Sequence, residues 1–508
     1  MTATKVHSSI RRYLSATWPV ATLALGRILF GAVMTISCLR FLILGWVEDQ
    51  YVTPKVHFPY YGFEWVQPLG EFGMYAVFIV MTGAALGILL GYQYRITSLT
   101  FALLFTYVEL IDKTYYLNHY YFVSIAAFLF TLLPANVGWS IDALRRPSIR
   151  RDHVPRWTVD ALKLQLALVY IHAGLAKISS EWLIDAMPLR IWLPAHDDLP
   201  LLGPFLTISW MPWVFSWAGM LFDCTIPFFL LSRRTRLVAW LAVLGFHVVT
   251  GMMFQIGVFP LVMIAMTLIF FSPEAHLRWL RRTTEHIPSN ILREKSPGEF
   301  TSRQTVSGKT LSEKSPGEVT SPQTVSGKTL PENSPGEVTS RQTVSGKILP
   351  ENSPGEFVSP SYLVPTVLAI HFFLQLLIPW RFLLYPGNRL WTEQGYRFGW
   401  RVMLIEKAGT ATFYVRDGKD GREGVVYNSD FLNAHQEKQM SMQPDMIVQF
   451  AGILRDHYRR QGMHDPHVRA EVWVTLNGAP SKLLVDPQRN LAAESDGLHH
   501  FDWILHHD

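Results

Sequence analysis

Long apolar runs dominate the chain and predict membrane-spanning helices. A helix needs about 20 mostly apolar residues to cross a bilayer, and nine runs approach that length, the eighth being the shortest. The first run is too long for a cleavable signal peptide and lacks a small-residue cleavage site, so we expect none. The nine runs are roughly 19–45, 71–92, 95–111, 119–135, 158–178, 208–231, 237–254, 258–272 and 361–381.

A different pattern follows the last apolar run. Residues 445–460 have the spacing of an amphipathic helix, and RDGKDGREG (416–424) carries the turn residues of a hairpin. The segments WRVMLIEK, ATFYVRD and RAEVWVTLNG, rich in β-branched and aromatic residues, predict strands. The fold class we expect is an α-helical polytopic membrane domain of about nine transmembrane helices, followed by a mainly β outer domain at 382–508.

A repeat separates the eighth and ninth apolar runs. The tetrapeptide SPGE recurs every 19 residues, beginning at Ser296, Ser315, Ser334 and Ser353. These repeats are too poor in large apolar residues to build a solenoid, so we predict a disordered loop. The chain then divides into a membrane domain at 1–283, the repeat loop at 284–358, a ninth helix at 359–381 and the outer domain at 382–508.

The position of the basic residues predicts the orientation of the chain. The spans, the repeat and the tail are left out of this count. If the spans alternate from an inside N-terminus, most of the remaining Lys and Arg residues fall on inside connections. The short outside loops then hold only Lys55, Lys113 and Arg190. This positive-inside bias explains the formal net charge of +5 without a nucleic-acid partner. It places 382–508 on the outer side, meaning the periplasm, the cell exterior or a lumen.

The two cysteines and two of the charged residues lie within spans. Cys38 and Cys224 both fall inside apolar runs, so we expect neither a disulfide framework nor a thiolate metal site. Arg27 and Asp223 each lie eight residues from the inner end of their run, which is a depth of roughly 12 Å at about 1.5 Å per residue. We predict that these two residues form a structural ion pair.

The fifth apolar run ends in YIHAGLAKISSEW, which contains His172 and Lys177. Ionisable residues in spans are costly and usually mark a function or a pair. Lys177 lies near the outer end, where it could simply extend to the interface. The small residues around it, such as Gly174, instead favour close helix packing.

Other polar residues occur at the same depth as Lys177. IDKTYYLNHYY (111–121) forms the outer connection between the third and fourth runs, and His247 lies past the middle of the seventh. An ordinary polar loop and a hydrogen-bonded core histidine are the alternatives. We expect an outward-opening pocket in which burial keeps Lys177 mostly neutral at pH 7, so that its amine can act as a base. Its candidate polar residues are Asp112, Lys113, Asn118, His119, His172 and His247.

Four motifs, in this order, resemble the vitamin K-dependent γ-glutamyl carboxylase family, whose membrane part is the HTTM domain. The first is Asp-Lys-Thr, three residues, then Asn-His, at 112–119. The second is Ala-Gly followed by Lys177 and a tryptophan, and the third is GFHVVTGMMFQIGVF around His247. The fourth, LWTEQGYRFGWRVML, contains Trp391, Gly395, Arg397 and Trp400, and resembles the opening of the outer domain in that family.

The resemblance implies a specific chemistry. In that family the lysine at the place of Lys177 deprotonates vitamin K hydroquinone, and the anion reacts with dioxygen. The strongly basic oxygenated product becomes the epoxide and removes a γ-proton from a peptide glutamate, whose carbanion captures carbon dioxide. His119, with Asn118, resembles the polar group beside the quinol. The implied cofactor is vitamin K hydroquinone or menaquinol, with dioxygen and carbon dioxide as co-substrates and no metal. The implied partners are the bilayer and a glutamate-containing peptide or protein docked on the outer domain.

The chain also departs from the family pattern. Ala176 precedes Lys177 where the family has a basic pair, and Tyr116 stands where animal members have Trp. The 19-residue repeats and the absence of a disulfide resemble a microbial branch, in which a clotting-type substrate is not expected. Two alternatives therefore stay open: a quinol epoxidase or oxidase that does not carboxylate protein, and a non-enzymatic membrane receptor or transporter.

Overall fold

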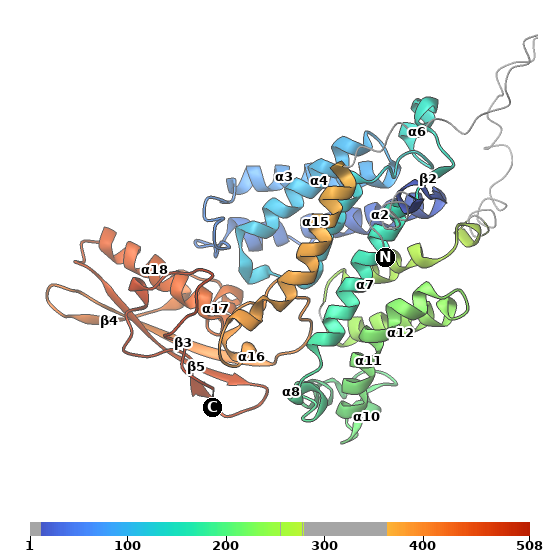
Figure 1. Ribbon diagram of the computed structural model, residues 1–508. Coiled ribbons are helices and arrows are strands. Elements are labelled where there is room, and N and C mark those ends of the chain that lie inside the picture. The colour runs from blue at the N-terminus through green and yellow to red at the C-terminus, as the bar shows by residue number, and fades with distance from the viewer. Residues whose placement is uncertain (1–11, 255, 277, 279–362, 508) are drawn as a thin grey trace, which may run out of the picture. The chain divides into compact units, whose positions relative to one another are not determined.

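The computed structural model describes residues 12–254, 256–276, 278 and 363–507. The elements below belong to one compact unit, Met1–Arg282 together with Leu363–Asp508 (Figure 1). The repeat at 284–358 lies outside the described residues. Its predicted disorder and the four-part division of the chain therefore stay predictions.

Within the described ranges, seven helices are long and apolar enough to cross a membrane. Their 18 to 23 residues correspond to about 27–35 Å at 1.5 Å per residue, which matches a hydrocarbon core. The helices are α2 (Ala21–Ile43), α3 (Gly70–Leu90), α4 (Tyr94–Ile111), α7 (Arg156–Ala176), α11 (Met211–Leu231), α12 (Arg236–Met253) and Leu363–Leu384, the last made of α15 (Leu363–Leu377) and the 3₁₀ segment η6 (Ile378–Leu384).

Two apolar helices in the same ranges are shorter than a typical span. Helix α5 (Asn118–Leu132) has 15 residues, and α13 (Phe259–Thr267) continues as the 3₁₀ turn η5 (Leu268–Phe270). They correspond to the fourth and eighth apolar runs of the sequence. The structure thus supports a multi-helix membrane domain, whereas the predicted number of nine spans is not confirmed.

Short elements connect these helices. Strands β1 (Thr17–Pro19) and β2 (His153–Pro155) pair antiparallel beside the starts of α2 and α7. The remaining connections are η1 (Glu48–Val52), η2 (Lys113–Tyr115), α6 (Ile141–Arg145), η3 (Pro147–Ile149), α8 (Ser180–Leu183), α9 (Leu189–Trp192), η4 (Pro194–His196) and α10 (Gly203–Leu206).

Helices α7 and α11 pack closely, and a glycine permits this contact. A Cβ atom added at Gly174 would lie 2.5 Å from Cys224 Sγ and 2.7 Å from the Cys224 nitrogen. Such distances are too short for any side chain, so only glycine lets the two backbones approach this closely. The close approach brings the C-terminal end of α7, where Lys177 caps the helix, against the middle of α11.

The C-terminal domain has a four-stranded antiparallel sheet in the order β4-β3-β5-β6. Buried and less buried residues alternate along β5, as expected for a sheet with one face on a core. Helices α17 and α18 complete the domain (Figure 1). The elements are α16 (Arg389–Thr392), β3 (Lys407–Arg416), β4 (Glu423–Val426), η7 (Asn428–Asp430), α17 (Ala434–Met440), α18 (Pro444–Arg460), β5 (His467–Leu476), β6 (Lys482–Leu483) and η8 (Leu491–Ala493).

The sequence predicts most of this domain correctly, but not all. The hairpin at 416–424 and the helix at 445–460 are confirmed by the β3–β4 pairing and by α18. WRVMLIEK (400–407) is not a strand up to its last residue, because Trp400 and Met403 have φ angles of 56° and 58°. The helices share the domain with the sheet, so the mainly β description is not confirmed.

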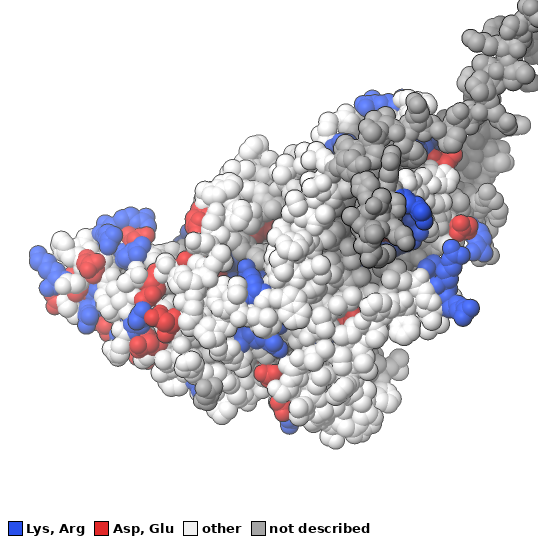
Figure 2. Space-filling model, in the orientation of Figure 1, with Lys and Arg blue, Asp and Glu red and all other residues white. Residues whose placement is uncertain are grey.

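Charge distinguishes the surfaces of the two regions. Charged side chains of both signs crowd the C-terminal domain on the face drawn in Figure 2, whereas wide areas over the helices carry few. Many large apolar side chains of the helices are exposed, including Phe72 and Ile79 on α3 and Leu237 on α12. An apolar outer surface is what a hydrocarbon environment requires.

Candidate functional site

An apolar cavity of about 630 Å³ lies among the helices of the membrane domain. It is contacted mainly by α5, α7, α11, α12 and α13, with further side chains from α8, α9 and the 402–403 segment. Most of its walls are aliphatic or aromatic, and only a few polar groups interrupt them, which is the usual composition of a small-molecule site. Those polar side chains are Asn118, His119, Tyr170, Lys177, Asp223, His247 and Thr250.

Lys177 and Asp223 form an ion pair in the cavity wall. The Lys177 Nζ atom donates to Asp223 Oδ2 at 2.8 Å and lies 3.3 Å from the Ala173 carbonyl oxygen. Only 6% of each side chain is exposed. An ion pair this deeply buried is costly to form and strongly destabilising to break on one side, so it is weak evidence for stability and stronger evidence for function.

A tryptophan holds the lysine from the other side. Lys177 Nζ lies 5.5 Å from the centre of the Trp182 ring, within cation–π range. The Trp182 indole Nε1 donates to the Ser216 carbonyl oxygen at 2.9 Å, which fixes α8 against α11. The segment after α7 therefore folds back so that an aromatic face covers the ammonium group.

His247 forms a second buried polar pair. Its Nε2 lies 3.0 Å from the Tyr170 hydroxyl, and its Nδ1 has no hydrogen-bond partner among the described residues. Both residues line the cavity. A buried polar atom without a partner is expensive, so this ring is available to a ligand that brings one.

Asn118 and His119 begin α5 at the opposite wall. The Asn118 Nδ2 donates to the Arg401 carbonyl oxygen at 2.9 Å, so the C-terminal domain helps to position this residue. His119 is buried, and its Nε2 finds no partner among the described residues. Its ring centre lies 5.4 Å from that of Phe259 on α13. The cavity thus has two partly unpaired imidazole rings and one lysine–carboxylate pair.

The other residues of the predicted pocket do not line this cavity. Asp112 accepts hydrogen bonds from Thr114 and Gln436 and lies 3.3 Å from His57 Nδ1. His172 Nδ1 lies 2.9 Å from the Leu168 carbonyl oxygen. Lys113 turns to a separate pocket between the 111–121 segment and the C-terminal domain. Asp112 and Lys113 therefore attach the motif to the C-terminal domain.

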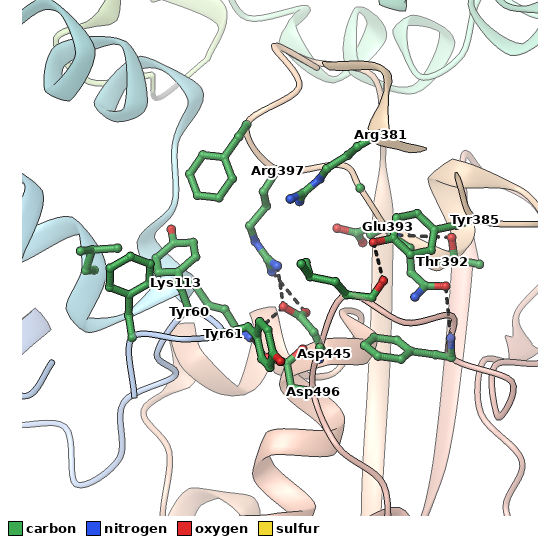
Figure 3. A pocket seen from close by; sticks show the side chains of 18 residues that line it. Tyr60, Tyr61, Lys113, Arg381, Tyr385, Thr392, Glu393, Arg397, Asp445 and Asp496 are labelled. Atoms are coloured by element: carbon green, nitrogen blue, oxygen red, sulfur yellow. Dashed lines mark hydrogen bonds and ion pairs between the residues drawn. The ribbon is translucent and has the colours of Figure 1, made fainter. Parts of the chain in front are cut away.

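That second pocket has a volume of about 240 Å³ and is more polar (Figure 3). Lys113 Nζ lies 2.8 Å from Asp445 Oδ2 and 3.1 Å from Asp496 Oδ2. Arg397 donates to Asp445 from the other side at 2.5 Å and also to Gln443. Figure 3 shows Arg397 directed at Asp445, with Lys113 beside it.

The charges of this pocket nearly balance. Burial by itself raises the pKa of Asp445, but Arg397 and Lys113 outweigh it, and the pKa falls below its ordinary value. Asp496 also touches Lys113, yet burial and then the Asp445 charge leave its pKa raised. Three cations and three carboxylates line the pocket, since Arg381 and Glu393 are added to this cluster of four. The Nε of Arg381 is buried without a partner among the described residues.

The four residues of the predicted outer-domain motif are buried or held by close neighbours, and two of them line this pocket. Trp391 and Trp400 are buried, the first donating to the Leu505 carbonyl oxygen at 2.8 Å and the second stacked on Tyr121. Gly395 has a φ of 73°, and an added Cβ would lie 2.7 Å from the Phe382 Cα, so only glycine fits. Gly395 and Arg397 line the second pocket.

The predicted ion pair between Arg27 and Asp223 is wrong. Asp223 pairs with Lys177, whereas the Arg27 guanidinium donates to the backbone carbonyl oxygens of Ile88, Leu89, Ala135 and Trp139. The prediction counted depth from the ends of two apolar runs and took no account of helix ends. The carbonyl groups of Ile88 and Leu89 lie in the last turn of α3, and those of Ala135 and Trp139 follow the end of α5, so these helix ends supply acceptors for the arginine.

Comparison with known families agrees with this architecture. The profile of the HTTM domain matches residues 16–275, and that of the vitamin K-dependent gamma-carboxylase lumenal domain matches residues 360–508. The chain belongs to the vitamin K-dependent gamma-carboxylase family. No solved structure matches it. The microbial branch suggested by the repeats stays a prediction.

Membership of the carboxylase family indicates what kind of protein the helices and the C-terminal domain form. The chain is a multi-pass membrane protein of carboxylase type with a lumenal-type C-terminal domain, and the family implies a vitamin K cofactor and a glutamate-containing substrate. In the described parts of the chain, no group of three or more His, Cys, Asp or Glu is arranged to hold a metal ion.

Sequence reasoning missed several residues of these two pockets. The roles of Asp223 beside Lys177 and of Tyr170 beside His247 were not foreseen. Asp445, Asp496 and Arg381 were not singled out at all. The signal for Asp223 was present, because an acidic residue in a span calls for a cation, but two cations were available and the depth estimate favoured the wrong one.

Proposed function

We propose that this chain is a membrane-embedded, vitamin K-dependent carboxylase whose reaction takes place in the apolar cavity. The observation that carries the proposal is the buried Lys177–Asp223 pair, at 2.8 Å, in the wall of that cavity. A structural ion pair alone would not need the surrounding space. A base that works on an apolar quinol needs both the space and protection from water.

The residues of the cavity fit a hydroquinone. Its two hydroxyl groups can supply the partners that His119 Nε2 and His247 Nδ1 lack, and its ring and tail match the aliphatic and aromatic walls. Lys177, His119 and Asn118 would hold the polar ring, with His247 as a further contact. When bound, the hydroquinone supplies, with dioxygen, the strong base that takes a γ-proton from glutamate, and the epoxide is the by-product.

In this proposal Lys177 reacts as the neutral amine: its Nζ accepts a proton from a quinol hydroxyl and leaves the quinol as its anion. Asp223 Oδ2 then stabilises the ammonium group that forms, as a buried carboxylate stabilises a catalytic imidazolium in a hydrolase triad. Asp223 therefore becomes part of the site, and the apolar walls exclude the water that would quench a strong base.

The second pocket is the part of the chain that we assign to the peptide substrate. Arg381 provides a guanidinium group suited to a carboxylate, and its Nε has no partner within the described ranges. The two pockets adjoin through a short segment, because the Tyr116 hydroxyl accepts from the Phe398 nitrogen at 2.8 Å and donates to Asn118 at 3.1 Å. A glutamate docked at one pocket can thus be presented to the other.

The proposal includes a topology of nine spans with the N-terminus on the inner side. Helices α5 and α13 with η5 join the seven longer helices to give this number. It places Lys177, the start of α5 and the C-terminal domain on the outer side. The inner side then carries the basic connections, in agreement with the positive-inside rule.

The decisive experiment uses the purified full chain in lipid nanodiscs. Reduced vitamin K, labelled bicarbonate and a glutamate-containing peptide are added, and the epoxide and the label fixed in the peptide are both measured. Epoxide together with fixed label supports the proposal. Epoxide without fixed label identifies a quinol epoxidase instead, and the absence of both under conditions where an active family member turns over refutes an enzymatic role.

A further inference from the structure

The cavity wall formed by α11 and α12 contains several residues that both line the cavity and are exposed. On α11, the row Phe215, Gly219 and Asp223 faces the cavity, and Gly219 and Asp223 are buried. Val214 and Ala218, which directly precede Phe215 and Gly219 in the sequence, also line the cavity. Both are exposed, Val214 to 45%.

Helix α12 shows the same feature at Gly245. This glycine lines the cavity and is exposed, and a Cβ built on it meets no atom within 4 Å. One turn along the helix, Val249 lines the cavity and is half-buried. The wall between the helices is therefore thin here, since it consists of small side chains and of Gly245, which has no side chain.

Aromatic rings close this gap on the inner side. The Phe222 ring on α11 stacks on Phe246 of α12, with 4.4 Å between the ring centres. Because α11 and α12 run antiparallel, Val214 and Ala218 on one helix and Val249 on the other lie on the same side of the stack, toward the start of α11, and Gly245 lies level with the stack. Figure 1 shows the two helices adjacent to each other.

The exposed side of this gap faces hydrocarbon. Both helices are apolar and of membrane length, and their outward residues near the gap, Trp217, Leu241 and Val248, are large, apolar and exposed. Water is absent at this depth, so an opening here exchanges contents with lipid tails and not with solvent.

We propose that the gap bounded by Val214, Ala218, Gly245 and Val249 is a lateral opening to the bilayer that holds the hydrocarbon tail of an amphiphilic ligand. The polar head of that ligand lies inside the cavity, at the level of Lys177 and Asp223, and its tail leaves between α11 and α12 into the lipid. The identity of the head as a quinol rests on the proposed function, whereas the tail opening rests on the exposure and the missing side chain described above.

The ligand class follows from the shape of the site. The apolar cavity of about 630 Å³ is enough for a two-ring head and part of a chain, while an isoprenoid tail of several units exceeds it. A tail that continues into the bilayer keeps all its methylenes out of water, each contributing about 0.8 kcal/mol. Tail length beyond the cavity is then tolerated without a larger pocket.

The test replaces the missing side chain. Gly245→Leu puts an isobutyl group in the gap, and Gly83→Leu on α3 is the matched control. A Cβ at Gly83 also meets nothing within 4 Å, and this glycine is exposed on a helix of similar apolarity outside the residues lining the cavity. Both changes replace a helical glycine with a better helix former, so neither should weaken folding.

Binding is measured on the full chain in phosphatidylcholine nanodiscs, by quenching of tryptophan fluorescence. The probes are 2-methyl-1,4-naphthoquinone without a tail and the same ring with a four-isoprene tail. For Gly245→Leu we expect affinity for the tailed quinone to fall by about tenfold or more, since part of the tail loses its path. Affinity for the tail-less ring should stay within about twofold, and Gly83→Leu should change neither. Unchanged affinity of Gly245→Leu for the tailed quinone would overturn the proposal, and so would an equal loss for both quinones.

A second measurement separates the opening from the identity of the head group. A twelve-carbon alkyl probe with a terminal photoreactive diazirine is irradiated with wild-type protein and both variants, and the labelled peptides are identified. Labelling of α11 and α12 that is lost in Gly245→Leu and kept in Gly83→Leu supports the opening, even where neither naphthoquinone binds and the proposed function fails. Equal labelling of that peptide pair in all three proteins overturns the opening.

Discussion

Lys177 and Asp223 meet at 2.8 Å because a glycine one turn before the lysine lets α7 approach α11. The pair joins a helix end to a helix middle, and 46 residues of sequence separate the two side chains. It is the arrangement on which the proposed chemistry depends most, and it leads directly to the first two predictions.

Asp223→Asn should lower the rate of quinol epoxidation by about 10²-fold, the scale of losing one preorganised charged partner. The amide keeps the shape of the carboxylate but no longer stabilises the ammonium group formed on Lys177. Thr225→Ala is the control, because Thr225 lies on the same helix and bonds only to the Leu221 carbonyl oxygen. A folded Asp223→Asn protein with the wild-type rate would remove Asp223 from the mechanism.

Lys177→Ala should lower the same rate by about 10²–10⁴-fold, the usual cost of losing a general base. Lys177→Arg should be almost as inactive, because a guanidinium group stays protonated. A small free amine is expected to restore part of the activity of the alanine variant. Near-full activity of Lys177→Arg would show that the residue only carries charge.

The structure adds a control that the sequence did not suggest. Lys177→Ala leaves Asp223 buried and unpaired, which typically destabilises by about 3–5 kcal/mol. Adding Asp223→Asn removes the orphaned charge, so the double variant should recover the thermal stability of the wild type in detergent while staying inactive. If the double variant regains activity, Lys177 is not the base.

Arg27→Lys should destabilise the membrane domain without changing the turnover of the protein that remains folded. A lysine cannot bond four carbonyl oxygens from one planar group, and each buried carbonyl left unpaired costs about 1–3 kcal/mol. Thermal unfolding in detergent measures the loss. If stability stayed at the wild-type value, the four backbone hydrogen bonds of Arg27 would carry no weight.

Asp445→Asn should destabilise the attachment of the C-terminal domain at neutral pH but not in strong acid. The folded pKa of Asp445 lies below its ordinary value of about 4. Its contribution is therefore fully present above about pH 4–5 and is lost only as the pH falls through the lower folded pKa. The difference in melting temperature between wild type and variant should shrink steadily below pH 4. A difference that grows on acidification would contradict this sign.

A reporter fused after Asp508 should behave as an exported domain. The basic connections favour an inside N-terminus, and an odd number of spans then places 382–508 on the outer side. An alkaline phosphatase fusion, active only after export, and a green fluorescent protein fusion, fluorescent only inside, give opposite readings. Fluorescence without phosphatase activity would show that the orientation or the span count is wrong.

The sequence predicted the parts of the fold that composition controls. Apolar runs mark α2, α3 and α7 because hydrocarbon demands such runs, and the 3.6-residue period of 445–460 marks α18. The strand predicted at 400–407 was wrong, because Trp400 and Met403 adopt left-handed backbone conformations in a segment of strand-like composition. Nothing in the residue types themselves announces those φ angles.

Only the site residues that belong to a recognisable sequence motif could be predicted. Lys177, Asn118 and His119 were chosen from the sequence, and all three line the cavity. Their partners were not found, since the carboxylate that meets Lys177 depends on where α7 ends relative to α11. The first residues of the 112–119 motif bond to the C-terminal domain, whereas its last residues line the cavity. This division depends on the folded structure and could not be predicted from the sequence.

The bonds between that motif and the C-terminal domain also set an order of events during synthesis. Gln436 donates to Asp112 across 324 residues, His435 Nε2 lies 3.0 Å from the Thr114 carbonyl oxygen, and Asn118 donates to Arg401 across 283 residues. A nascent chain that has delivered all its helices to the bilayer still lacks these contacts. The wall that carries His119 reaches its final position only after the C-terminal domain has folded. A truncated or stalled chain would therefore have an incomplete cavity, and it should not start the proposed oxidation of the quinol.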